Sequence, residues 1–217
     1  MSPDERLVPA REGRVELRER ASRFLAIAVP CASPAAANDL LARWRREFHD
    51  ATHVAYAWRI GTDGRGTGVE RSSDAGEPSG TAGKPIALAI QSAAVSDVLV
   101  AVVRWYGGTK LGTGGLARAY RSAAEGALAE AGSRTVADTR TVAVSCPWER
   151  MGDLRRLVRP PEVTVVSERF EEAIAIVRLA VFRSRLLALA AALDDARLSY
   201  SLEDGRGAAG PESGIPG

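Results

Sequence analysis

The chain has 217 residues, of which 46% are hydrophobic and 26% are charged, fractions that are typical of a globular protein and exclude a disordered chain. Its 29 basic and 27 acidic residues leave a net charge of +2, which excludes a polybasic nucleic-acid binder but not a local basic patch. With two cysteines, Cys31 and Cys146, the chain has neither a disulfide framework nor a four-cysteine zinc site.

No targeting or membrane segment is predicted. The N-terminal region mixes acidic and basic residues and has no apolar core of a signal peptide. The most apolar stretch, residues 85–103, is interrupted by polar residues and does not read as a transmembrane helix. We therefore expect a cytoplasmic protein.

The first half of the chain alternates between strand and helix patterns. The strands are predicted at 14–30 (one or two strands), 51–60 and 97–106, the last of them central in a sheet. The helices are predicted at 34–49, 82–95 and 115–131, and a long loop without structure at 61–80. Ser33 and Pro34 are typical of a helix start, since Ser caps free amides and Pro has no amide to leave unpaired.

The second half begins near Asp138 and has the order strand, helix, strand, strand, helix, strand, which is typical of a ferredoxin-like domain. Its elements are predicted at 141–146, 148–158, 163–169, 173–181, 183–195 and 198–203. The chain is therefore expected to be α+β with two domains, 14–135 and 138–204, and a disordered tail over 205–217. The domains are expected to join near 132–140 in a linker that proteases cut readily.

Two glycine-rich segments carry most of the functional information, Ser73 to Pro85 and Arg104 to Leu116. Each ends at a predicted helix start, where free amides and the helix dipole favour an anion, and each contains a lysine. The residues predicted to bind a nucleic acid or a phosphate are His53, Glu77, Ser79, Gly80, Thr81, Gly83, Lys84, Arg104, Gly107, Gly108, Lys110, Gly112, Gly114, Gly115 and Arg118. The alternative is that these glycines only permit tight turns.

Other chemical motifs are absent or incomplete. A P-loop is excluded because Pro78 and Pro85 occupy two of its required positions, and the formal dinucleotide-binding pattern lies too far beyond its strand. The two histidines lack a third ligand, so no metal and no cofactor are predicted. Glu77 and Asp74 form a conceivable acid–base pair, the alternative being that both carboxylates accept hydrogen bonds from loop amides.

Together these segments resemble the IMPACT/YigZ family. The family pattern is matched by Asp50 to His53, by Ser73 to Pro85 with one change and by Arg104 to Tyr120 with two changes. The change in the first long segment is Ala75, which replaces the second of two aspartates and argues against a metal-binding or chemical role for that pair. The resemblance spans about residues 14–131.

The resemblance implies a first domain with the fold of the second domain of a small-subunit ribosomal protein. It also implies a second domain similar to the ferredoxin-like last domain of elongation factor G. Eukaryotic members of the family regulate translation initiation through protein contacts, so we expect a non-enzymatic binding protein of the translation or RNA machinery. Its expected partner is RNA, the ribosome or a translation-related protein. The alternatives are an enzyme acting on a phosphorylated small molecule and a pure protein-interaction module.

The second domain is expected to add affinity for a larger partner. Its short helix over 148–158 carries a modest basic face, although such a face is more often just a solvated surface. The arginines in and beside that helix are Arg150, Arg155, Arg156 and Arg159.

Overall fold

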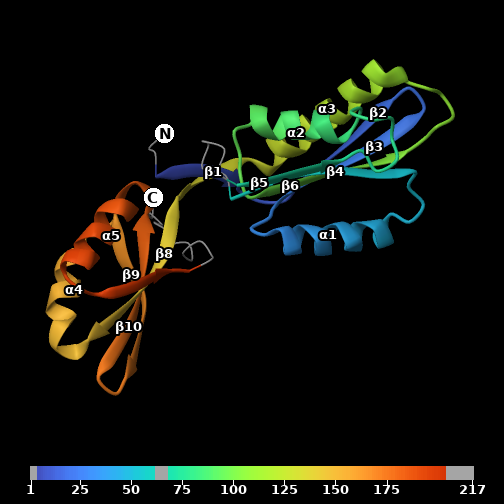
Figure 1. Ribbon diagram of the computed structural model, residues 1–217. Coiled ribbons are helices and arrows are strands. Elements are labelled where there is room, and N and C mark those ends of the chain that lie inside the picture. Colours follow the sequence, from blue (N-terminus) through green and yellow to red (C-terminus); the bar gives the residue numbers. More distant parts are fainter. Residues whose placement is uncertain (1–3, 62–67, 204–217) are drawn as a thin grey trace, which may run out of the picture. The chain divides into compact units, whose positions relative to one another are not determined.

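The structure is a computed structural model that describes residues 4–61 and 68–203 (Figure 1). The predicted tail over 205–217 and part of the predicted 61–80 loop lie outside the described residues. The chain divides into two compact units. The large unit comprises residues 6–135, and the small unit combines residues from the start of the chain with those that follow residue 135.

A five-stranded antiparallel sheet forms the centre of the large unit, with the strand order β2-β3-β6-β4-β5. Its strands are β2 (Gly13–Glu19), β3 (Ser22–Pro30), β4 (His53–Ile60), β5 (Val69–Ser73) and β6 (Val98–Trp105). The predicted central position of the 97–106 strand is confirmed, because β6 lies in the middle of the sheet and seven of its eight residues are buried.

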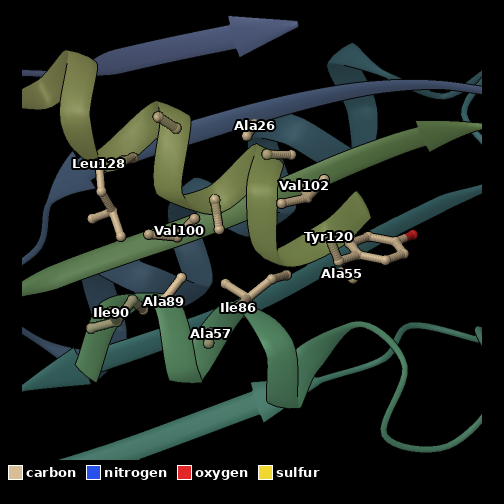
Figure 2. Packing of buried hydrophobic residues seen from close by; sticks show 14 of the residues in the cluster. Ala26, Ala55, Ala57, Ile86, Ala89, Ile90, Val100, Val102, Tyr120 and Leu128 are labelled. Carbon is tan, nitrogen blue, oxygen red and sulfur yellow. The ribbon is translucent and has the colours of Figure 1, made fainter. Parts of the chain in front are cut away.

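Helices cover both faces of this sheet: α2 (Gly83–Ser92) and α3 (Gly112–Ala131) on one side and α1 (Pro34–Glu47) on the other (Figure 1). The alternation along β4 divides its side chains between two cores, because Ala55 and Ala57 pack under α2 and α3 while Tyr56 and Trp58 pack against α1. Figure 2 shows how small strand side chains leave room for the aliphatic side chains of α2.

The predicted helix start at Ser33 is confirmed. Ser33 Oγ accepts a hydrogen bond from the Ala36 amide at 3.2 Å, and Pro34 is the first residue of α1. This bond satisfies one of the amides that have no partner inside the helix.

Three local predictions are wrong. The segment 61–80 is not wholly a loop, since β5 forms an edge strand whose polar, exposed residues hide the strand pattern. The helix α3 begins at Gly112 and not at Gly115, so four residues of the second glycine-rich segment form its first turn. The junction expected over 132–140 does contain the boundary between the units, but it is not an irregular linker: β7 (Ser133–Ala137) pairs with β1 (Glu5–Pro9), and β8 begins at Thr139.

The small unit has the predicted ferredoxin-like fold. Its sheet has the order β11-β8-β10-β9, with every pair antiparallel, and α4 and α5 pack on one face (Figure 1). The elements are β8 (Thr139–Pro147), η1 (Trp148–Arg150), α4 (Met151–Leu157), β9 (Val163–Glu171), β10 (Ile174–Phe182), η2 (Arg183–Arg185), α5 (Leu186–Asp195) and β11 (Ser199–Leu202). The two-domain α+β fold class is thereby confirmed.

Both ends of the described chain contribute to the small unit. The buried Asp4 accepts hydrogen bonds from the Ser184 amide at 2.8 Å and from the Ser184 hydroxyl at 2.6 Å. The Asp4 carbonyl also accepts from the Asp138 amide at 2.7 Å. The start of the chain is therefore part of the small unit's structure.

Candidate functional site

A buried ion pair connects the two glycine-rich segments. Arg104 at the end of β6 donates from Nη1 to Oε1 of Glu77, in the loop between β5 and α2, at 2.6 Å. The two residues are only 4% and 8% exposed. The same Glu77 oxygen accepts from the Tyr120 hydroxyl of α3 at 2.8 Å, and Arg104 Nη2 donates to Ser22 Oγ at 3.1 Å. Charge-assisted hydrogen bonds thus fasten the first loop to the sheet and to α3.

Tyr120 contributes a hydroxyl that remains protonated. Figure 2 shows Tyr120 at the edge of the apolar cluster, with its hydroxyl oxygen pointing out of it. Burial and the negative charge of Glu77 both raise the pKa of Tyr120, so the hydroxyl is a lasting donor to this carboxylate. Sequence analysis did not select Tyr120 or Ser22 for the site, although Tyr120 ends the second family motif.

His53 lies beside the same carboxylate. Its Nδ1 is 2.9 Å from the Ala75 carbonyl oxygen, and because a carbonyl can only accept, Nδ1 carries the hydrogen. Its Nε2 lies 3.9 Å from Glu77 Oε2. The structure therefore brings together three of the predicted ligand-binding residues, His53, Glu77 and Arg104, in contacts within the protein.

Asp74 occupies the amides at the start of α2. Its carboxylate accepts hydrogen bonds from the amides of Gly80 at 2.8 Å, Ala82 at 2.9 Å and Gly83 at 2.8 Å. Ala82, which precedes the helix, has no side chain that could cap it, so Asp74 replaces an N-cap from eight residues upstream. An external anion at this helix start would have to displace Asp74.

The charge of Asp74 is stabilised by these contacts. Burial alone raises the pKa of the Asp74 carboxyl, but the three amide hydrogen bonds together outweigh it and hold the pKa below its ordinary value. Asp74 thus accepts hydrogen bonds from loop amides, as the alternative to an acid–base pair predicts. Glu77 instead accepts hydrogen bonds from the guanidinium of Arg104 and the phenol of Tyr120.

The remaining residues of the first loop divide between interior and surface. Thr81 is buried and donates from Oγ1 to the Pro78 carbonyl at 2.6 Å. Gly83 is also buried, and a Cβ on it would lie 2.8 Å from the Ser73 backbone nitrogen. Among the predicted ligand-binding residues of this segment, the exposed ones are Ser79, Gly80 and Lys84.

The start of α3 is open, in contrast to that of α2. Its capping residue, Leu111, makes no side-chain hydrogen bond, and the first amides of a helix have no partner inside it. Gly112 and Gly114 are exposed and Gly115 is half-buried. A Cβ placed on Gly114 would lie 3.6 Å from Arg118 Nη1, so the guanidinium of the exposed Arg118 lies beside this first turn.

Two further exposed cations and an exposed ring belong to, or contact, the segment that leads into α3. Arg20, in the turn between β2 and β3, donates from Nη1 to the carbonyl of the exposed Lys110 at 3.0 Å. Tyr106 is 43% exposed, and its amide donates to Thr52 Oγ1 at 3.0 Å. Sequence analysis missed Arg20 because it lies 90 positions before Lys110, and no motif links the two.

Gly107 holds this segment against the β2–β3 turn. A Cβ on Gly107 would lie 1.8 Å from the Ala21 carbonyl oxygen, so only glycine allows this approach. The next glycine, Gly108, is exposed and has a φ of +88°, which glycine adopts without strain. The second segment is therefore held at Gly107 and is exposed from Gly108 to Lys110.

A shallow depression of about 230 Å³ lies next to His53. Its lining includes Arg45, His49, Thr52 and Ala75, but no residue of the 107–115 segment. The two glycine-rich segments are thus linked through the buried ion pair and do not share this depression.

The described residues contain neither a cluster of metal ligands nor a helix that could span a membrane. Within residues 4–61 and 68–203, no three histidine, cysteine or acidic side chains are placed to hold a metal ion together. Every helix in the same ranges is too short or too polar to cross a lipid bilayer.

The fold and this site define a class of two-unit α+β proteins whose larger unit presents glycine-rich segments at two helix starts. Comparison of the sequence agrees, since the family model of the Impact N-terminal domain matches residues 20–128. The chain belongs to the IMPACT family, as its resemblance to the IMPACT/YigZ pattern indicates.

Individual relatives support this assignment. A Thermus thermophilus protein described as an IMPACT family member is 44% identical over 138 residues, which cover 64% of this chain and 72% of the relative. The IMPACT family member YigZ of Escherichia coli is 29% identical over 191 residues, covering 87% of this chain and 92% of YigZ. A crystal structure described as that of a hypothetical protein superposes with a TM-score of 0.68 at 27% identity, covering 93% of this chain and 98% of that one.

Proposed function

We propose that this chain is a non-enzymatic regulator of translation that binds single-stranded RNA through phosphates at the start of α3. Membership of the IMPACT family supports the link with translation, because eukaryotic members, on the resemblance described above, regulate its initiation. Such a role would place the protein in the cytoplasm.

The observation that carries the proposal is the difference between the two helix starts. At α2 the amides are bound by Asp74, whereas at α3 the first turn is exposed, uncapped and flanked by cations. Unpaired amides and the positive end of a 20-residue helix favour a phosphate. The half-exposed ring of Tyr106 offers a face on which an unpaired base can stack.

The contacts around Glu77 favour binding over catalysis. A group that transfers protons needs access to its substrate, but Glu77 is buried and holds Arg104 and Tyr120. We infer that this cluster keeps the loops in place and that the ligand contacts the exposed cations Lys110, Arg118 and Arg20.

The proposal is tested by titrating labelled single-stranded RNA into the full chain and measuring fluorescence anisotropy at several salt concentrations. Affinity should fall with salt with a log–log slope of about −0.7 for each phosphate contacted, and the slope should be shallow because few cations are available. Lys110→Ala and Arg118→Ala should each weaken binding and reduce the slope.

Lys84→Ala is the matched control, because Lys84 is an exposed lysine at the start of α2, where Asp74 holds the amides. It should change the affinity less than Lys110→Ala does. Equal losses in the two variants, or no detectable binding to several RNAs at low salt, would reject the proposed site.

A further inference from the structure

Two exposed aromatic rings are stacked on each other in the small unit. Trp148 of η1 and Phe170 of β9 have ring centroids 4.8 Å apart and ring planes inclined by 25°. Each residue keeps about half of its surface exposed, 50% for Trp148 and 51% for Phe170. Large rings that remain this exposed are enriched in protein interfaces, where they act as anchors.

The rings lie where the helices do not cover the sheet. Phe170 is paired across the strands with Ala175, a core residue under α4 and α5, so it points to the face that carries the helices. Yet β9 is the edge strand, and its residues from Val165 onward are all exposed. The face beside Phe170 is therefore free within this unit.

Acidic side chains surround the pair. Glu149 follows Trp148, Glu168 lies on the same face of β9 as Phe170, and Glu172 is in the turn after the strand. All three glutamates are exposed, and among the described residues the ion pairs of this unit use other acidic groups.

Two of the arginines near this face are already paired with another carboxylate. Arg150 and Arg156 both donate to Asp153, so two of the four arginines of the predicted basic face are already paired. Hydrogen bonds from these two arginines also lower the pKa of Asp153. Arg169 lies on the opposite face of β9 from Phe170, because neighbouring residues of a strand alternate.

We propose that Trp148, Phe170 and these three glutamates, the acidic aromatic patch, form a docking site for an arginine-rich segment of a partner protein. A guanidinium can stack on an indole face and pair with a carboxylate at the same time, which an ammonium does less well. The three negative charges repel the phosphates of a nucleic acid and attract a basic peptide. This site is separate from the RNA site proposed for α3.

The test uses the full chain and three synthetic peptides of equal length: one arginine-rich with an apolar residue at its centre, its lysine counterpart and its glutamate counterpart. Binding is followed through the fluorescence of Trp148, obtained as the difference between the wild type and Trp148→Phe. Calorimetry is an independent measure of binding. The arginine peptide should bind most tightly, the lysine peptide more weakly and the glutamate peptide not at all.

Trp148→Ala and the double change Glu149→Gln with Glu168→Gln should each weaken binding of the arginine peptide at least about tenfold, as expected for interface anchors. The double change leaves both rings in place, so a folding defect in Trp148→Ala does not remove the test. Leu187→Ala is the control, because Leu187 is 85% exposed on α5 in the same unit and should have no effect.

Four outcomes would overturn the proposal: no binding of the arginine peptide, affinity unchanged by either variant, tighter binding of single-stranded RNA at this patch, or self-association of the chain that Trp148→Ala abolishes. Loss of RNA binding in Lys110→Ala while the peptide still binds would separate this site from the proposed function.

Discussion

Ala75 adopts a backbone conformation that its side chain disfavours. Its φ is +49°, in the left-handed region, where a residue other than glycine, asparagine or aspartate is strained by about 1–2 kcal/mol. The family pattern has aspartate at this position, a residue that tolerates the conformation better. The aspartate of the family pattern therefore has a conformational explanation that requires neither a metal nor catalysis.

Replacing Ala75 by glycine should stabilise the protein. Relief of the left-handed strain exceeds the extra flexibility that glycine gives the unfolded chain, for a net gain of about 0.5–1 kcal/mol. Urea unfolding measures the change, with Ala42→Gly in α1 as the control, which should lose about 1 kcal/mol. If Ala75→Gly lowered the free energy of unfolding as much as Ala42→Gly does, the backbone of Ala75 would not be strained.

The buried ion pair should be costly to break from one side. Glu77→Gln leaves Arg104 charged and buried without its counter-ion, and we expect a loss of about 3–5 kcal/mol. Tyr120→Phe removes one hydrogen bond to a charged acceptor and should cost less, about 1.5–3 kcal/mol. Urea unfolding at neutral pH measures both losses of unfolding free energy. A smaller loss in Glu77→Gln than in Tyr120→Phe would show that the guanidinium reaches water in the variant.

At the scale of elements, α2 depends on a cap from outside its own sequence. Asp74→Ala removes the acceptor for three amides and should cost at least about 1 kcal/mol at neutral pH. Because the folded-state pKa of Asp74 lies below its ordinary value, its contribution is complete above about pH 4 and is lost as the pH falls through the folded-state pKa.

Unfolding of the wild type and of Asp74→Ala at neutral pH and near pH 2 checks this dependence. The two stability curves should converge at the lower pH. A difference that stays constant with pH would mean that the charge of Asp74 contributes nothing.

Patterns in the sequence predict those helices and strands whose residues are buried alternately or continuously along the element. The apolar run of β6 and the residues of β4 are of this kind, and so is β10 of the small unit. The three short strands β1, β5 and β7 were missed, and most residues of β5 and β7 are exposed and polar. All three are edge strands, held by backbone hydrogen bonds that a side-chain pattern does not show.

The candidate site could be predicted only in part for a related reason. The glycine-rich segments are visible in the sequence, but the partners of Asp74, Glu77 and Arg104 depend on how distant segments pack. Arg104 contacts Glu77 across 27 positions and Ser22 across 82, so its role in the interior follows from the fold and not from a motif.

At the scale of the whole molecule, the large unit should fold alone. A fragment of residues 1–135 retains the five-stranded sheet and its three helices, so circular dichroism should show a cooperative thermal transition. The fragment should also bind RNA with an affinity close to that of the full chain, because the α3 site lies entirely within it. A folded fragment that binds no RNA, when the full chain does, would place the binding site elsewhere.

The contribution of Asp4 to the small unit bears on how the chain folds during its own synthesis. Ser184, the partner of Asp4, is synthesised 180 positions after it. At about 5–20 residues per second the delay is roughly 10–40 s, while the large unit can already be complete. The segment that contains Asp4 therefore has to stay accessible until Ser184 has been made, and a fusion that holds this segment back would slow the maturation of the small unit.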